Sequence, residues 1–511
     1  MFAEVAYLFR HALVRSAAYE LQPPSDRARL HALALKLMEE ILGGRPSVLP
    51  PLSQSLDAVY IPHPSDPHAH ELVEHARAAS SAMSIEEVRE IVRLYLRRAA
   101  HFAVASYRNG AAADYWGQLA EMETGPDRAE ALRRCSLVVS SLGQYAQGQQ
   151  LLQEALEVLK AQADPRIQAA VLKSLVSNAE FAAELPGTEA WGERALELYR
   201  ELEDSLGYCS VLISLASARL AAGNMAGVET AHSEALEIAR REGFRYQEAN
   251  ILVIRSIVHQ QQARYSDAER DSSEGLDIAR ELNDVRLETF ALSNRANLHA
   301  AMGRTDLAEQ EFIEVLALNR RIGARGGEAV SLMNMGNNYD FQSRRPEAER
   351  AYELALEMAR ETGNRRLEGV VLGNQAMTLM ETGRLEQAEE HLLRALAIHQ
   401  SVGGRRSEAI CRSALAQVMR RRGLHTAAEV EAAHALAMHA ELGTRYFTAA
   451  TLCDRALLFL ETGRLERARV DWCQGTAILS ELGHTRELEK QHASLREVCR
   501  QTGYDDLDLK S

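Results

Sequence analysis

The sequence predicts an all-α protein built as an α-solenoid of stacked helical hairpins. Three observations lead to this fold class. Glycines recur in one 40-residue frame, and small residues recur at fixed distances from them. The composition is poor in aromatic residues (5%) and in proline (12 of 511) but rich in helix formers. A fixed period of about 20–50 residues is typical of repeat architectures.

The frame has nine positions, and each marks the turn of one hairpin. They are Gly143, Ala183, Gly223, Ala263, Gly303, Ser343, Gly383, Gly423 and Gly463. A second set follows twenty residues later: Gly243, Gly323, Gly363, Gly403, Gly443 and Gly483. Glycine just past a helix end adopts the left-handed conformation at little cost, so each set indicates a chain reversal. We expect two helices of about 14 residues per unit, and an irregular turn near Ala183, because Pro186 and Gly187 follow it.

Small residues predict where the helices cross. Five positions after the turn residue stand Ala268, Ala308, Ala348, Ala388, Ala428 and Ala468. Twelve after it stand Ala155, Ala195, Ala235, Gly275, Ala355, Ala395, Ala435 and Gly475, each followed by a leucine except Gly475. Seven before it stand Ala216, Ser256, Ala296, Gly336, Ala376, Ala416 and Ala456. Helices approach closely only where side chains are small, so these positions are expected to be buried.

This pattern resembles the tetratricopeptide repeat family, in the long-period form of bacterial signal-transduction regulators. The resemblance covers residues 126–484. It implies a right-handed superhelix whose first helices line a concave groove.

Residues 8–20 and 27–39 resemble a segment of bacterial signalling ATPases, which include transcription activators and repeat-bearing cyclases and kinases. In that family the segment ends a winged-helix part that links the NTPase core to helical repeats. Residues 70–77 and 95–102 resemble the first helices of its repeat domain. The resemblance implies a regulatory part of such a protein, without its NTPase core.

The chain is accordingly divided into five parts. These are an arm-like helical segment (1–42), a proline-rich linker (43–70), the first helices and first hairpin (71–125), nine repeats (126–484), and a capping helix with a tail (485–511).

Composition and motifs exclude several functions. A net charge of −14 gives no global attraction to nucleic acid or anionic lipid, so neither is an expected direct partner. None of the five lysines follows a glycine, which excludes the Gly-Lys pair of a P-loop. No GxSxG or HExxH motif occurs, so we expect no enzyme activity, no cofactor and no metal. Six scattered cysteines and the lack of a long apolar run predict a cytoplasmic protein.

Three further groups have both a functional and a structural interpretation. The histidines at 63, 68, 70 and 75 suggest a metal site, but their spacing favours solvated or packed rings. Cys453 and Cys473 suggest a redox pair or, more simply, free thiols. Arginines at the turns (344–345, 365–366, 405–406 and 420–422) suggest an anionic partner or complements to helix dipoles.

Asparagines are the candidate binding residues. Asn294, Asn334 and Asn374 stand nine positions before the turn residue, and Asn297 and Asn337 stand six before it. These spacings place all five on one face of successive first helices, where an amide can donate to and accept from a peptide backbone. The alternative is that they bridge neighbouring helices.

The predicted function is a non-enzymatic interaction and regulatory module that binds a protein or peptide in its concave groove. The alternative is a sensor of a small signal molecule or signal peptide that relays to an NTPase, a cyclase or a transcription regulator.

Overall fold

The computed structural model describes residues 19–56, 60–182, 187–221, 224–262 and 264–504. Most of the 8–20 segment, the irregular turn at 183–186 and the frame positions 223 and 263 lie outside the described residues. Within the described ranges every regular element is a helix, which confirms the all-α prediction. The chain divides into an N-terminal unit (residues 1–138 and 154–163) and a repeat unit (139–153 and 164–511).

The N-terminal unit is a series of helices, and each of the first three packs on the next. They are α3 (Pro24–Ile41), α4 (Ala69–Ala78), α5 (Ile85–Ala105), α6 (Asn109–Met122) and α7 (Gly125–Ser141). We call the segment between α3 and α4 the strap, and the regular elements among its described residues are the short 3-10 turns η1 (Leu52–Gln54) and η2 (Asp66–His68). Proline restricts its backbone and removes N–H donors, so helix does not persist there. Arg97 and Arg98 of α5 donate hydrogen bonds to backbone carbonyl and side-chain oxygens of the strap.

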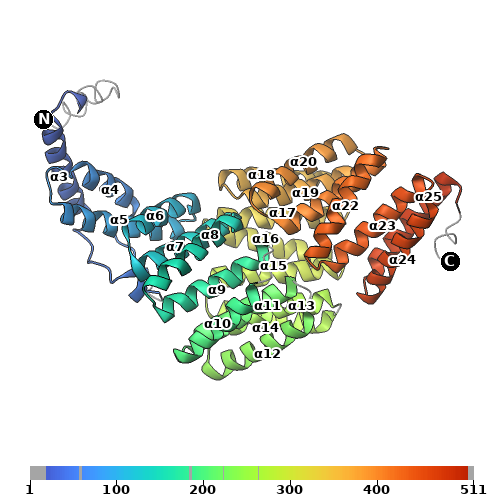
Figure 1. The fold of residues 1–511 in the computed structure, drawn as a ribbon, viewed down its shortest axis with the longest axis horizontal. Coiled ribbons are helices and arrows are strands. Elements are labelled where there is room, and N and C mark those ends of the chain that lie inside the picture. Colours follow the sequence, from blue (N-terminus) through green and yellow to red (C-terminus); the bar gives the residue numbers. More distant parts are fainter. Residues whose placement is uncertain (1–18, 57–59, 183–186, 222–223, 263, 505–511) are drawn as a thin grey trace. The chain divides into compact units, whose positions relative to one another are not determined.

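The repeat unit is a stack of antiparallel helix pairs, and α8 (Tyr145–Ala161) is divided between the two units. Its first helices are α9 (Pro165–Ala182), α11 (Ser205–Ala221), α13 (Arg245–Gln261), α15 (Val285–Ala301), α17 (Arg325–Phe341), α19 (Arg365–Glu381), α21 (Arg405–Arg421) and α23 (Arg445–Glu461). Its second helices are α10 (Thr188–Glu201), α12 (Met225–Glu242), α14 (Tyr265–Glu281), α16 (Thr305–Arg321), α18 (Arg345–Glu361), α20 (Leu385–Ser401), α22 (His425–Glu441) and α24 (Leu465–Glu481), and α25 (Thr485–Thr502) follows. Figure 1 shows these pairs succeeding one another along the chain.

The turns explain the regular frame. From α13 onward the first helices begin every 40 residues, and most helices have 17 residues, longer than the predicted 14. Only three residues connect successive helices, because a single residue in the left-handed conformation is enough to end a helix and reverse the chain. At the turn after α15, Gly303 has φ 78°, and the Arg304 N–H donates back to the carbonyl of His299 at 2.9 Å. Ser343 and Asn283 adopt the same conformation without being glycine, with φ 60° and 53°.

The predicted crossing residues are buried. The six alanines from Ala268 to Ala468 are 0% exposed. A Cβ built on Gly475 would lie 2.8 Å from the carbonyl oxygen of Ala449, and one on Gly336 would lie 2.6 Å from the Tyr352 ring. These approaches leave no room for a larger side chain, so the predicted register is confirmed.

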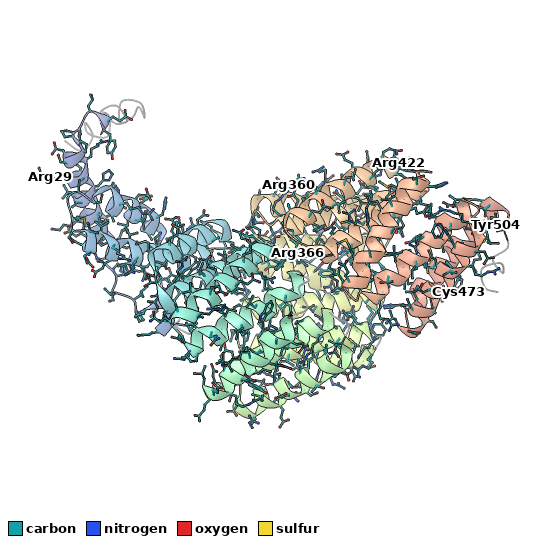
Figure 2. All side chains as sticks on the ribbon, in the orientation of Figure 1. Arg29, Arg360, Arg366, Arg422, Cys473 and Tyr504 are labelled. Carbon is teal, nitrogen blue, oxygen red and sulfur yellow. The ribbon has the colours of Figure 1, made fainter. Side chains whose placement is uncertain are left out.

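The repeat unit also contains a contact between hairpins far apart in the sequence. Helix α9 packs against α21. The guanidinium of Arg366, labelled in Figure 2, lies over the Tyr145 ring, 5.4 Å from its centre. This cation–π contact joins the start of α8 to the start of α19.

None of the described helices has the length and hydropathy needed to cross a bilayer.

Candidate functional site: the face of the first helices

The first helices form the inner side of the hairpin stack. Each contacts the first helix of the next hairpin directly, from α9 through to α23. Second helices show no comparable contact with one another within the described ranges. Since the stack is tighter along its first helices, their free face is the candidate binding surface. We call its part on α15, α17, α19 and α21 the inner face.

Four rows of side chains run along the inner face, at 40-residue steps. They are Phe290, Val330, Val370 and Ile410; Asn294, Asn334, Asn374 and Ala414; Asn297, Asn337, Met377 and Gln417; and Ala301, Phe341, Glu381 and Arg421. Phe290 is 39% exposed and Phe341 is 45% exposed. Fourteen of the sixteen side chains are apolar or neutral amides. Of the two charged ones, Glu381 is paired with Arg345. The surface is therefore nearly uncharged, in a chain of which 25% is charged.

The five predicted asparagines all lie on this face, but they differ in their partners. Asn294 donates to the carbonyl of Phe290 in its own helix at 2.7 Å. Asn374 donates to the side-chain oxygen of Asn337 at 2.9 Å, which links α19 to α17. Asn297 and Asn334 make no side-chain hydrogen bond with another described residue. Among the five asparagines, one hydrogen bond thus links successive first helices, and the side-chain amides of Asn297 and Asn334 are unbonded among the described residues.

The Asn337 oxygen also accepts a hydrogen bond from the Tyr352 hydroxyl at 2.8 Å. Tyr352 is 1% exposed, and burial raises the pKa of its hydroxyl, which therefore stays a donor. This contact anchors the Asn337 oxygen and leaves its N–H₂ group available.

Beyond α21 the inner surface becomes polar. Gln417 donates to Asp454 of α23 at 2.5 Å, and burial raises the pKa of Asp454 to about 6. The cavity at this point is only about 10 Å³, which is room for about one water molecule.

The hairpins contain a recurrent buried ion pair that the sequence analysis did not predict. An arginine eight positions before the turn residue meets an acid eight positions after it, as in Arg255–Asp271 (2.5 Å) and Arg295–Glu311 (2.7 Å). Arg455–Asp471 repeats the pair at 2.6 Å. The signal was visible as residues of opposite charge placed symmetrically about positions 263, 303 and 463.

A second recurrent pair joins successive hairpins. An arginine just after the turn residue reaches a glutamate 35 positions earlier, on the preceding second helix. The pairs are Arg264–Glu229, Arg304–Glu269, Arg344–Glu309, Arg384–Glu349 and Arg464–Glu429. We call this series the inter-hairpin ladder. At position 424, where leucine stands, Arg422 (Figure 2) pairs with Glu389 instead.

These pairs also account for most of the arginines at the turns. Arg345 meets Asp340 and Glu381, Arg405 meets Glu441 at 2.5 Å, and Arg420 meets Glu461. Because their charge is balanced within the chain, these arginines do not support an anionic partner at the turns.

The histidine and cysteine candidates do not form sites. His75 contacts His31 at 2.7 Å, while His63 contacts Ser65 at 2.8 Å. No group of three metal-ligating side chains occurs among the described residues. Cys453 is buried against Gly475, Cys473 is exposed, and neither forms a disulfide with another described residue.

The fold and its inner face define a helical-repeat protein of the α-solenoid class. Residues 288–361 and 367–441, which make up most of the inner-face hairpins, match the family model of the tetratricopeptide repeat. The chain therefore contains tetratricopeptide repeats at these positions.

Comparison with solved structures gives alignments of low sequence identity and low TM-score. A Rap protein complexed with competence and sporulation factor is 11% identical, with 82% of this chain and 99% of that chain covered and a TM-score of 0.47. A signal transduction ATPase with numerous domains and a tetratricopeptide repeat sensor, from Pyrococcus horikoshii, is 14% identical, with 85% and 74% covered and a TM-score of 0.43. No curated protein sequence matches the chain significantly.

Proposed function

We propose that the protein is a non-enzymatic interaction module that binds an extended peptide segment on its inner face. The observation that carries this proposal is the pairing of two rows. The row of Asn294, Asn334 and Asn374 runs beside an apolar row one helical turn away, which begins at Phe290.

The chemistry of the two rows suits a peptide backbone. A side-chain amide donates and accepts, as a peptide group does, so a row of amides can hold an extended chain without reading its side chains. The apolar row then offers area for the ligand's apolar side chains, at about 25 cal/mol per Å² buried. A polyanionic ligand is not favoured, because Arg421 is the single cationic side chain among the sixteen.

The test is the triple variant Asn294→Ala/Asn334→Ala/Asn374→Ala. Peptides selected from a random heptapeptide library on the wild-type chain serve as probes. One lost hydrogen bond to a neutral amide costs about 0.5–1.5 kcal/mol, so three should weaken peptide binding by about one to three orders of magnitude. Calorimetric titration measures the affinity, and a thermal melt of the same preparation measures stability.

A matched control separates binding from folding. Gln400→Ala changes an exposed amide on the second helix α20, where it reaches only Glu408, and should leave affinity unchanged. A large melting shift of the triple variant with intact affinity in its folded fraction would mean that the asparagines only bridge helices.

We infer that the module acts in signalling together with an NTPase, cyclase or kinase. The support is the resemblance of residues 8–20 and 27–39 to the segment that precedes helical repeats in signalling ATPases. The 511 residues contain no Gly-Lys phosphate cradle. The purified chain is therefore expected to hydrolyse no ATP, and measurable hydrolysis would contradict the inference.

A further inference from the structure

The spacing of the first helices sets a repeat distance on the inner face. Successive first helices from α15 to α21 approach within 8 Å between Cα atoms where they touch. Helices packed in this way have axes about 8–10 Å apart. Each row of the inner face takes one side chain from each helix, so the row repeats at about this distance. A ligand that crosses the helices therefore meets a row at every step of about 8–10 Å.

This repeat distance favours one backbone conformation of an extended peptide. A β-strand presents the same side at every second residue, which is a step of about 6.6 Å, and its third residue faces the opposite side. A polyproline II helix has three residues per turn and rises about 3.1 Å per residue, so it presents the same side about every 9.3 Å. The step of the polyproline II helix lies within the range set by the helices, and the step of the strand does not. A polyproline II segment therefore keeps its register along the rows.

The hydrogen bonds of Asn337 favour a ligand that presents carbonyl groups. The side-chain oxygen of Asn337 accepts from the Tyr352 hydroxyl at 2.8 Å and from the Asn374 amide at 2.9 Å, so both of its lone pairs are used. The residue is exposed, and its N–H₂ group makes no hydrogen bond with another described residue. Asn337 can therefore donate to a ligand but cannot accept from it. A proline residue presents a carbonyl and no N–H, which matches such a donor.

The apolar side chains of the inner face also suit proline. The row that begins at Phe290 is uncharged, and the rings of Phe290 and Phe341 are exposed. Grooves that bind polyproline II segments are typically lined by aromatic side chains. A proline-rich segment holds this conformation when it is free, so it loses little conformational entropy on binding.

We propose that the inner face binds an uncharged, proline-rich segment in the polyproline II conformation, which crosses α15, α17, α19 and α21 with one turn of the ligand on each helix. One edge of the ligand places its carbonyls against the two asparagine rows, and a second edge places every third side chain against the row that begins at Phe290. Four helices then take about twelve residues of ligand. The proposal rests on the proposed function, because it specifies the class of peptide that the same face binds.

The test compares three peptides of twelve residues. The first has leucine at every third position and proline elsewhere. The second has the same composition, but its leucines stand in adjacent pairs. The third keeps the leucines of the first and has threonine, which favours a strand, in place of every proline. In calorimetric titration of the full chain, the first peptide should bind saturably and about tenfold more tightly than either of the others.

The outcomes distinguish this proposal from the proposed function. If peptides from the heptapeptide library bind but the proline peptide does not, the polyproline II ligand is refuted and peptide binding stands. Equal affinity for the first two peptides, or for the first and the third, would also overturn the polyproline II ligand. If no peptide binds, those from the library included, both proposals fail.

Asn337→Asp tests the outward donor and preserves the hydrogen bonds within the fold. The aspartate keeps one oxygen for Tyr352 and Asn374, and it places a second oxygen where the N–H₂ group was. Affinity for the proline peptide should fall about tenfold, because attraction to a ligand carbonyl becomes repulsion. Unchanged affinity in a folded Asn337→Asp protein would overturn the proposal.

Two further variants complete this experiment. Gln310→Glu adds the same charge at an exposed position of the second helix α16 and should leave the affinity unchanged. A thermal melt reports whether Asn337→Asp is folded. If it is not, Asn297→Asp decides, because this exposed side chain stands in the same row one hairpin earlier. Its affinity for the proline peptide should fall by at least about threefold, and unchanged affinity would refute the proposal.

Discussion

Ser343 carries a local strain that its glycine counterparts avoid. It adopts φ 60° at a turn where Gly303 and Gly383 have φ 78° and 76°. The left-handed conformation costs an L-residue about 1–2 kcal/mol. Glycine avoids this strain, but it also raises the conformational entropy of the unfolded chain, which offsets part of the gain in stability. Ser343→Gly should therefore raise the free energy of unfolding by about 0.5–1 kcal/mol. Urea unfolding measures it. Thr382→Gly, at a helix end with φ −89°, is the control and should not stabilise.

Ala388 tests the packing at a single crossing. Its side chain is 0% exposed and packs with Leu372 and Leu392 in one core cluster. A phenylalanine there overpacks the crossing, so Ala388→Phe should cost about 1–3 kcal/mol. The exposed Leu393→Phe is the matched control, and unchanged melting of Ala388→Phe would refute the crossing.

Single residues also show what the sequence could and could not predict. Glycines, alanines and asparagines were informative because each has one dominant reason to recur in a frame. The ion pairs were missed because arginines and acidic residues are common throughout the sequence, so their symmetric placement about the turn positions is noticed only once the fold pairs them. The hydrogen bonds of Arg97 were missed for another reason: their acceptors, Pro50 and Ser55, lie more than 40 residues away, and no periodic pattern records that contact.

At the scale of the hairpin, the buried ion pair is replaceable. In α17 and α18 the positions equivalent to Arg255 and Asp271 hold Met335 and Ala351. Asp271→Ala alone should cost about 3–5 kcal/mol, because it leaves Arg255 without its carboxylate. The double variant Arg255→Met/Asp271→Ala should recover most of this loss.

Equilibrium unfolding of both variants and of Arg255→Met alone completes the cycle. Equal destabilisation in the double variant and in Asp271→Ala would show that the hairpin requires the charge itself.

At the scale of the whole molecule, buried histidines make stability depend on pH. Burial lowers the pKa of three histidines, His232, His399 and His439, to about 4 each. A nearby arginine lowers each pKa further: Arg255 acts on His232, Arg366 on His399 and Arg406 on His439. In the unfolded chain these rings take up a proton below about pH 6.5. The folded state binds fewer protons between pH 6.5 and 4, so stability is full above this window and falls as pH decreases through it.

His232→Leu isolates one of these contributions. Both ring nitrogens of His232 are buried without a hydrogen-bond partner, so leucine removes no bond. Between pH 7.5 and 5 the wild type should lose about 2 kcal/mol more than the variant does. Urea midpoints at both pH values measure the difference, and an identical pH response in the two proteins would contradict it.

The contact between Tyr145 and Arg366 has a consequence for how the chain is made on the ribosome. Most hairpin contacts join neighbours in the sequence, so each hairpin can pack on its predecessor as it emerges. Tyr145 and Arg366 are 221 positions apart, so the Tyr145 ring stays uncovered while the five intervening hairpins are synthesised. At about 5–20 residues per second this wait lasts roughly 10–45 s. Synthesis therefore completes the local packing first and this long-range contact afterwards.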